Sequence, residues 1–232
     1  MQSGIQNIWT DAAVLSFSGT DTETFLQGYI TSDTCRSNSD EFLPTSITDI
    51  KGRVLASGWS LKQPEGIDLI VHQSIAKKIE SFLHPYLQFS KSVLSCEKKI
   101  VCHSDKGIPL FNQHPIEIKE KTLCQESSMK KDDELLELLT KHHFTFIEEK
   151  ISGQFLPQQL GLHTSGAVDF DKGCYLGQEI VARVQFRGSV KKTLSAVELS
   201  PGQYSVGDRL EDRSILVQIS KSGQGLVVGS AD

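Results

Sequence analysis

The chain has 232 residues, enough at about 100–200 residues per domain for one large domain or two to three small ones. Hydrophobic residues make up 38% and charged residues 23%, which predicts a packed globular protein and excludes wholesale disorder. The net charge of −5 argues against a protein that grips nucleic acid through a general basic excess, although a local basic patch stays compatible with it.

No membrane or export segment is predicted. No apolar run approaches the ~20 residues of a membrane helix, and residues 1–11 lack the basic start and apolar stretch of a signal peptide. We therefore expect a cytoplasmic protein without membrane contact. We also expect a monomer. The cysteines occur at irregular spacing without a CxxC pair, so neither a disulfide framework nor a zinc site is predicted. They are Cys35, Cys96, Cys102, Cys124 and Cys174.

The chain begins with a short β-prone run at residues 13–17. A helix carrying Phe25 and Leu26 follows, and we expect it to end at Gly28, because glycine favours helix C-termini. This is the start of an α+β pattern.

A hairpin and an amphipathic helix come next. Residues 41–50 and 53–61 predict two strands joined by a turn at Gly52, and residues 67–71 predict a third strand. Residues 74–87 place apolar side chains at helical spacing, so this helix is expected to lie on the sheet.

The second half of the chain is less regular. Residues 134–142 predict a helix with a broad apolar face, whereas residues 151–188 are rich in glycine, glutamine and aromatic residues and lack periodicity. Such a long irregular segment in a compact chain is usually functional. Short alternating runs then predict a small antiparallel sheet or partial barrel. These runs are 193–199, 215–220 and 225–229.

A cysteine between two glycines is the strongest chemical signal. Cys174 stands between Gly173 and Gly177, directly before a stretch at 178–186 that predicts a helix. A thiol at a helix N-terminus feels roughly half a positive charge, and Lys172 adds a cation, so both favour the thiolate. A small buried cysteine is the alternative, which the polar and glycine neighbours disfavour.

On the helix that follows, Glu179, Arg183 and Arg187 are spaced at i, i+4 and i+8 and share one face. One interpretation is a solvated stripe held by an i,i+4 ion pair. The other is an anion-binding subsite beside the thiol, for a phosphate, a glutamyl carboxylate or a nucleic-acid backbone. The sequence leaves both open.

These residues resemble the signature of a known family, YgfZ. The resemblance rests on the string KGCYLGQE at residues 172–179, with the arginines that follow it. YgfZ proteins are folate-binding relatives of aminomethyltransferases, implicated in iron–sulfur cluster assembly or repair. Further segments match in the expected order along residues 12–195. They are Phe25-Leu26-Gln27-Gly28 with Thr31-Ser32-Asp33, then Lys51-Gly52-Arg53, then Gln154-Phe155-Leu156-Pro157-Gln158.

The resemblance implies an α+β fold like that of the glycine-cleavage T-protein, with domains around a central folate cavity and a small C-terminal antiparallel β-barrel. It divides the chain into an N-terminal α+β part of the folate-binding domain (1–92), a reduced middle α+β part (93–150), the cysteine-motif segment returning to the folate-binding domain (151–190) and a barrel-like C-terminal domain (191–232). The chain departs from the family at Leu135, where relatives carry an aromatic residue, and in residues 142–147, which lack a Gly-x-Pro.

The function that the resemblance implies is a folate-binding accessory role in the assembly or repair of iron–sulfur clusters, including those of tRNA-modifying enzymes. Cys174 and Lys172 would carry the chemistry. The implied partners are tetrahydrofolate or a related folate, iron–sulfur client enzymes or assembly factors, transient iron–sulfur species, and a tRNA; no resident metal site is predicted. The folate contacts would be Gln27, Lys51, Arg53 and Phe155. Trp59 joins them because it lies on a strand next to the Lys51-Gly52-Arg53 turn and could stack on a pterin. The motif residues around the thiol and its anion would be Gly173, Tyr175, Gly177, Gln178, Glu179, Arg183 and Arg187.

Two other functions stay open. A tetrahydrofolate-dependent aminomethyl or one-carbon transferase would need an acidic residue near the transferred carbon, and Asp33, Asp49 and Asp169 are candidates by residue type alone. An RNA-binding module is the second alternative. It would use Lys191 and Lys192 together with Arg183 and Arg187.

Overall fold

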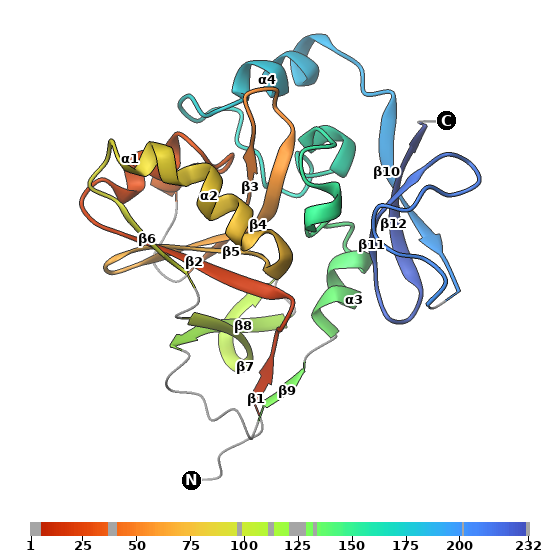
Figure 1. The fold of residues 1–232 in the computed structure, drawn as a ribbon, viewed down its shortest axis with the longest axis horizontal. Helices are drawn as coiled ribbons and strands as arrows, with labels where there is room; N and C mark the ends of the chain where they lie inside the picture. The colour runs from red at the N-terminus through yellow and green to blue at the C-terminus, as the bar shows by residue number, and fades with distance from the viewer. Residues whose placement is uncertain are drawn as a thin grey trace.

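The computed structural model describes residues 6–36, 41–96, 99–110, 114–120, 129–131, 134–200 and 202–230. Within these residues the chain forms three β-sheets with helices packed between and beside them (Figure 1). Cys124 and the side chain of Leu135 lie outside the described part. No helix in these ranges combines the length and the apolar character that crossing a bilayer requires.

The largest sheet has five antiparallel strands in the order β3-β4-β5-β2-β6. The predicted hairpin is confirmed, with Gly52 at a φ of +70° in its turn. The fold also places β6 in this sheet, paired with β2, although its residues were expected to start the middle part. The strands are β2 (Ala12–Ser18), β3 (Phe42–Thr48), β4 (Val54–Gln63), β5 (Gly66–His72) and β6 (Val93–Cys96).

Strand β4 is buried along most of its length because both faces of the sheet are covered. On one face, α2 (Ala76–Leu87) packs Ile79 and Leu83 into a core that includes Leu55. On the other face, Trp59 belongs to a second core. This double coverage accounts for the near-continuous run of small and apolar residues in β4, in place of strict alternation.

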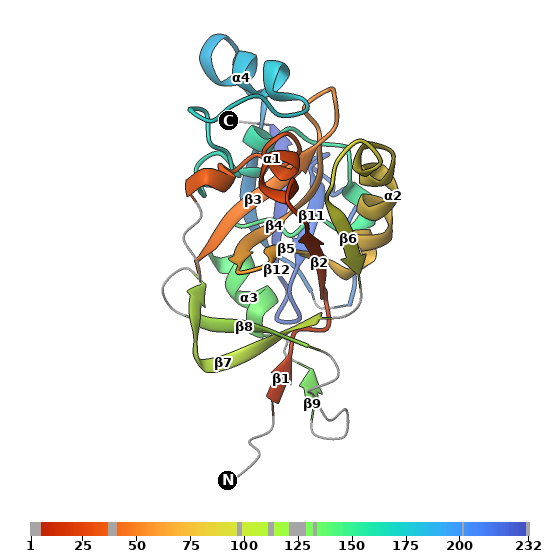
Figure 2. The ribbon, with the colours of Figure 1, turned by 90° about the vertical axis from the view of Figure 1, so that its left-hand side faces the viewer.

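The middle of the chain forms a second sheet together with the N-terminus. Its strands are β8 (His114–Glu120), β7 (Lys99–Leu110), β1 (Gln6–Ile8) and β9 (Met129–Lys131), in that order. Strand β1 runs antiparallel to β7 and parallel to β9. The N-terminal strand therefore ties the middle part of the chain to the first sheet, as Figure 2 shows from the side.

The C-terminal sheet is open. It contains β10 (Lys192–Glu198), β12 (Gln224–Ser230) and β11 (Ile215–Ile219), with β12 in the centre. The predicted antiparallel strands are confirmed, but the described residues do not close them into the expected barrel, because three strands leave two free edges. Helix α3 (Glu134–Lys141) packs on this sheet.

One hydrophobic core joins the three sheets. It includes Val14 of β2, Val101 of β7 and Val228 of β12, with Phe144 and Phe146 from the segment between them. The remaining helices, α1 (Thr22–Gln27) and α4 (Gln178–Arg187), lie near the tip of the β3–β4 hairpin (Figure 1). Between α3 and α4 the chain forms only short 3-10 turns, as the irregular composition predicted.

Candidate functional site

The four segments that carry the family resemblance are far apart in the sequence, and the fold brings them together. The backbone N–H of Leu176 donates to the carbonyl oxygen of Gly28 at 2.9 Å, joining the cysteine motif to the end of α1. The N–H of Val54, directly after the β3–β4 turn, donates to the carbonyl oxygen of Phe155 at 2.8 Å. Gln158 donates its amide to the carbonyl oxygen of Val181 on α4 at 2.8 Å.

The β3–β4 turn meets the start of α4 at a pair of glycines. Gly177 is the N-terminal cap of α4 and has a φ of +86°. A Cβ at this position would lie 2.3 Å from the carbonyl oxygen of Asp49, and a Cβ at Gly52 would lie 3.2 Å from the carbonyl oxygen of Gly177. The contact at Gly177 excludes any side chain, whereas glycine at position 52 is favoured mainly by its φ of +70°, with a tight but smaller contact.

Lys172 attaches the cysteine motif to residues 27–32. Its side chain is buried, and its ammonium donates to the carbonyl oxygens of Gln27 at 2.8 Å, Ile30 at 2.7 Å and Ser32 at 2.9 Å. The same nitrogen lies 5.3 Å from the centre of the Tyr175 ring. Burial lowers the pKa of Lys172 to about 8. All three N–H groups of the ammonium are engaged, so Lys172 acts as a structural anchor.

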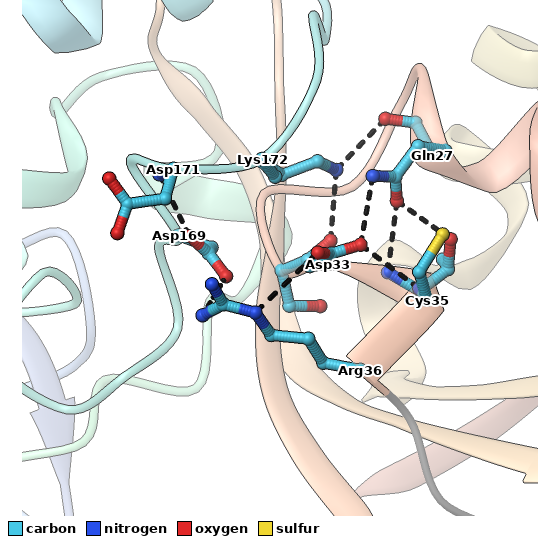
Figure 3. Close-up of polar contacts among 9 residues, drawn as sticks. Gln27, Asp33, Cys35, Arg36, Asp169, Asp171 and Lys172 are labelled. Carbon is cyan, nitrogen blue, oxygen red and sulfur yellow. Dashed lines mark hydrogen bonds and ion pairs between the residues drawn. The ribbon is translucent and has the colours of Figure 1, made fainter.

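Two carboxylates surround this anchor (Figure 3). Arg36 bridges them, with 2.8 Å between Nη1 and an Asp169 oxygen and 3.7 Å between Nε and an Asp33 oxygen. Asp33 also accepts from the Gln27 amide at 2.9 Å and from the Cys35 N–H at 3.0 Å. Burial opposes ionisation of Asp33, but these hydrogen bonds outweigh it and lower its pKa. Asp33 thus braces residues 27–36 as a carboxylate, and Arg36 joins this segment to the one that leads into the cysteine motif through its ion pair with Asp169.

The third acidic candidate, Asp49, is also engaged locally. Its carboxylate accepts from the N–H groups of Lys51 at 2.9 Å and Arg53 at 2.8 Å, which closes the β3–β4 turn. A carboxylate that satisfies a turn in this way has a structural task already.

Arg36 is a residue that no sequence motif singled out. It stands outside the matched segments, and its partner Asp169 was considered only for its residue type. Thr31, inside a matched segment, is buried and donates to the carbonyl oxygen of Ala167 at 2.5 Å. Only its place in the motif could have indicated this role, because the contact spans 136 positions.

Cys174 is exposed, on the loop between the Lys172 anchor and the hydrogen bond of Leu176. Its thiol makes no hydrogen bond to the described residues. The two groups expected to stabilise a thiolate, the N-terminus of α4 and the ammonium of Lys172, do not lie where the sequence predicted them. Helix α4 begins only at Gln178, and the helix field fades beyond its first turn, while the ammonium of Lys172 is spent on carbonyls. The structure confirms that the thiol of Cys174 is exposed. That this thiol is ionised stays a prediction.

The glycine before the cysteine is not required by packing. A Cβ at Gly173 would have none of the described atoms within 4 Å, and this residue does not have a positive φ. Gln178 supports the loop instead, with its amide 3.5 Å from the carbonyl oxygen of Lys172.

Tyr175 points into the protein on the other side of the thiol. Its ring is buried, and its hydroxyl has no hydrogen-bond partner among the described residues. Burial raises the pKa of this phenol. Tyr175 therefore contributes its ring to the packing beneath the loop.

The charged stripe on α4 contains the ion pair that one interpretation predicted. Arg183 donates to Glu179 at 2.8 Å, and both side chains are exposed. Arg187 follows one turn later, also exposed. The anion-binding interpretation stays a prediction.

Three of the predicted folate contacts are engaged with other residues of the protein. Trp59 is 1% exposed, and its ring stacks on Phe144 with 4.6 Å between ring centres. Phe155 is buried in the same core. The Gln27 amide donates to Asp33, and its oxygen accepts from the N–H and the hydroxyl of Thr34.

The other two contacts, Lys51 and Arg53, are exposed on the β3–β4 turn, where Arg53 donates to the carbonyl oxygen of Gln154. A cavity of about 520 Å³ lies elsewhere, between β2 and α2, and includes none of the five residues. In the part of the chain that the structure describes, Trp59 and Phe155 are packed in the core and the Gln27 amide is taken up by its neighbours, so these side chains do not face one cavity together with Lys51 and Arg53. They do not fit a folate pocket, and we assign no chemical step to a folate.

No family model matches this chain. Curated proteins named "tRNA-modifying protein YgfZ" do resemble it. The protein of that name from Escherichia fergusonii is 28% identical over 223 aligned positions, covering 79% of this chain and 68% of the relative. Proteins of the same name from Escherichia coli and Shigella dysenteriae match with the same identity and coverage. The resemblance to YgfZ proteins that the motifs predicted is confirmed.

A solved structure supports the fold. The aminomethyltransferase T of the glycine cleavage system from Bartonella henselae superposes with a TM-score of 0.69, covering 98% of this chain and 79% of that protein, at 10% sequence identity. The T-protein-like α+β fold is confirmed by this similarity.

Proposed function

We propose that this YgfZ-like chain is an accessory protein in the assembly or repair of iron–sulfur clusters, including those of tRNA-modifying enzymes, and that it acts through the thiol of Cys174. The observation that carries the proposal is the exposure of Cys174 on a loop anchored on both sides, by Lys172 and by Leu176. An exposed thiol in a fixed position can reach a metal or sulfur centre on another protein, which a buried thiol cannot.

The chemistry that suits this arrangement is transient ligation. As a thiolate, Cys174 supplies one soft ligand for iron. The motif contains a single cysteine, and protein-held clusters usually take four, so the client protein or small thiols supply the others. The described residues contain no group of three or more His, Cys, Asp or Glu side chains placed to hold a metal ion. The iron–sulfur species is therefore cargo in this proposal.

A folate enters the proposal through the resemblance alone. Titration calorimetry of the purified protein with tetrahydrofolate tests it directly. Saturable heat at one site per chain would support folate as a ligand and would require a pocket other than the five residues predicted for it. Absence of heat would remove folate and leave the thiol proposal in place.

The thiol is tested by complementation of an Escherichia coli strain that lacks its own YgfZ. We expect Cys174→Ser to abolish restoration of iron–sulfur-dependent tRNA modification, measured by mass spectrometry of tRNA nucleosides. Cys35→Ser is the matched control, because Cys35 is also exposed and lies on the neighbouring segment. Full restoration by Cys174→Ser, at wild-type protein abundance on an immunoblot, would exclude the thiol from the function.

A further inference from the structure

The positive charge of this acidic protein is concentrated around α4. Residues 172–192 carry five cations and one anion, a net charge of +4, while the whole chain carries −5, so the remaining residues carry −9. Four of the five cations are exposed: Arg183, Arg187, Lys191 and Lys192. A positively charged segment can attract a polyanion even though the protein as a whole is acidic. The net charge of the chain does not reveal such a segment.

An exposed aromatic ring lies among these cations. Phe186 is 70% exposed on α4, between Arg183 and Arg187 at helical spacing. Its ring is held in place edge-to-face by Phe170, with 5.6 Å between ring centres and 73° between planes. A large apolar ring kept in solvent but fixed from behind offers a free face for stacking.

The β3–β4 turn extends the same surface. The close approach of Gly52 to Gly177 and Ile180 sets the turn against the first turn of α4, and the two project together at one end of the molecule (Figure 1). Lys51 is exposed on this turn, next to Ile50, which is 73% exposed. The turn thus adds a further cation and a further apolar side chain to the surface of α4.

We propose that this surface binds RNA. Phe186 stacks on an unpaired base, and the arginines and lysines contact phosphates on either side of it. We define this RNA-binding surface by Lys51, Arg183, Phe186, Arg187, Lys191 and Lys192. Interleaved cations and one fixed exposed ring match single-stranded nucleic acid, in which bases are free to stack and phosphates are closely spaced.

The inference deepens the proposed function by naming its macromolecular partner, and it rests on that function for the choice of tRNA as the probe. The surface lies on the helix that directly follows the Cys174 loop, so a bound tRNA would be held beside the thiol.

Fluorescence anisotropy with labelled tRNA tests the surface, at about 50 mM and about 200 mM salt. We expect Arg183→Gln/Arg187→Gln to weaken binding and to lower the slope of log affinity against log salt by about 1–1.5, because Arg187 loses a phosphate contact and Arg183, which must leave its ion pair with Glu179 to reach a phosphate, loses a second. We expect Phe186→Ala to weaken binding about tenfold or more while leaving that slope unchanged, because stacking releases no counterions.

Lys77→Gln/Lys78→Gln is the matched control. It removes the same charge from an exposed pair on α2, away from the RNA-binding surface, and should leave affinity within about twofold. Circular dichroism melts establish that each variant is folded. If the control weakened binding as much as the arginine variant, the binding would be nonspecific electrostatic attraction, and the proposal would be overturned.

The proposal is also overturned if tRNA does not bind at low salt, or if Phe186→Ala binds as tightly as the wild type. Binding of poly-glutamate but not of tRNA would identify an acidic protein as the partner instead. The assay contains no iron–sulfur client, so its failure leaves the Cys174 proposal standing. Failure of the complementation test, in turn, leaves the binding result unaffected.

Discussion

The ammonium of Lys172 lies 2.7 Å from the carbonyl oxygen of Ile30, a residue 142 positions earlier in the chain. This contact and its two companions hold the cysteine motif against the segment that follows α1. Lys172, two positions before Cys174, therefore has a structural role in holding the loop.

Removing this ammonium should loosen the loop. Lys172→Met keeps an unbranched side chain but leaves the carbonyl oxygens of Gln27, Ile30 and Ser32 without their donor. We expect the free energy of unfolding to fall by about 1–3 kcal/mol in urea titrations. Lys51→Met, on the exposed turn, is the control and should change it by less than about 0.5 kcal/mol. An unchanged unfolding midpoint in Lys172→Met would contradict the anchoring role.

Stability should also depend on pH through Lys172. Burial lowers its pKa to about 8 in the folded protein, whereas the unfolded chain keeps the ordinary value of 10.5. Between these values the unfolded state binds a proton that the folded state does not, so stability rises with pH; below pH 8 both states are protonated and the slope disappears.

The measurement is the difference in unfolding free energy between wild type and Lys172→Met, from about pH 7 to about pH 10. The difference should shift in favour of the wild type above pH 8, by at most about 1.4 kcal/mol per pH unit. A flat difference across this window would place the pKa of Lys172 at its ordinary value.

The two glycines beside Cys174 should respond differently to substitution. Gly177→Ala puts a Cβ 2.3 Å from the carbonyl oxygen of Asp49 at a φ of +86°, and should destabilise the protein by about 2 kcal/mol or more. Gly173→Ala meets open space and should cost less than about 1 kcal/mol. Thermal unfolding of the pair compares them directly, and similar melting temperatures would refute this reading of the turn.

Tyr175 should tolerate loss of its hydroxyl. The group is buried without a partner, so Tyr175→Phe removes an uncompensated polar atom and should leave stability equal or higher. Tyr175→Ala should cost about 3–5 kcal/mol, because the ring fills space beneath the loop. Urea unfolding of both variants separates ring from hydroxyl. A clear loss of stability in Tyr175→Phe would reveal a hydrogen bond to the phenol.

Local signals in the sequence were sufficient for the regular elements near the site. The turn at Gly52, the helix that ends before Gly28 and the helix that starts at Gln178 follow from residue periodicity and from glycine. Each depends on neighbours within a few positions, which a single sequence displays.

Side-chain directions could not be obtained in this way. Trp59 was expected to face a folate because it follows the β3–β4 turn, but it stacks with Phe144 and lies 6.0 Å from Trp9, a residue placed there by the N-terminal segment. The three-residue strand β1 gave no periodic signal of its own. The direction of Lys172 is likewise set by carbonyls more than 100 positions away.

The tethering of the cysteine loop to the α1 region also has a kinetic side. Besides local hydrogen bonds such as that of Gln178, the loop is held by ties that reach back about 140 positions, so it acquires its final shape only once it has packed against residues 27–32. In a chain that is still being synthesised, or that is partly unfolded by heat, Cys174 is therefore not held in a fixed position. Under the role proposed for Cys174, exchange of iron or sulfur would then be restricted to fully folded molecules.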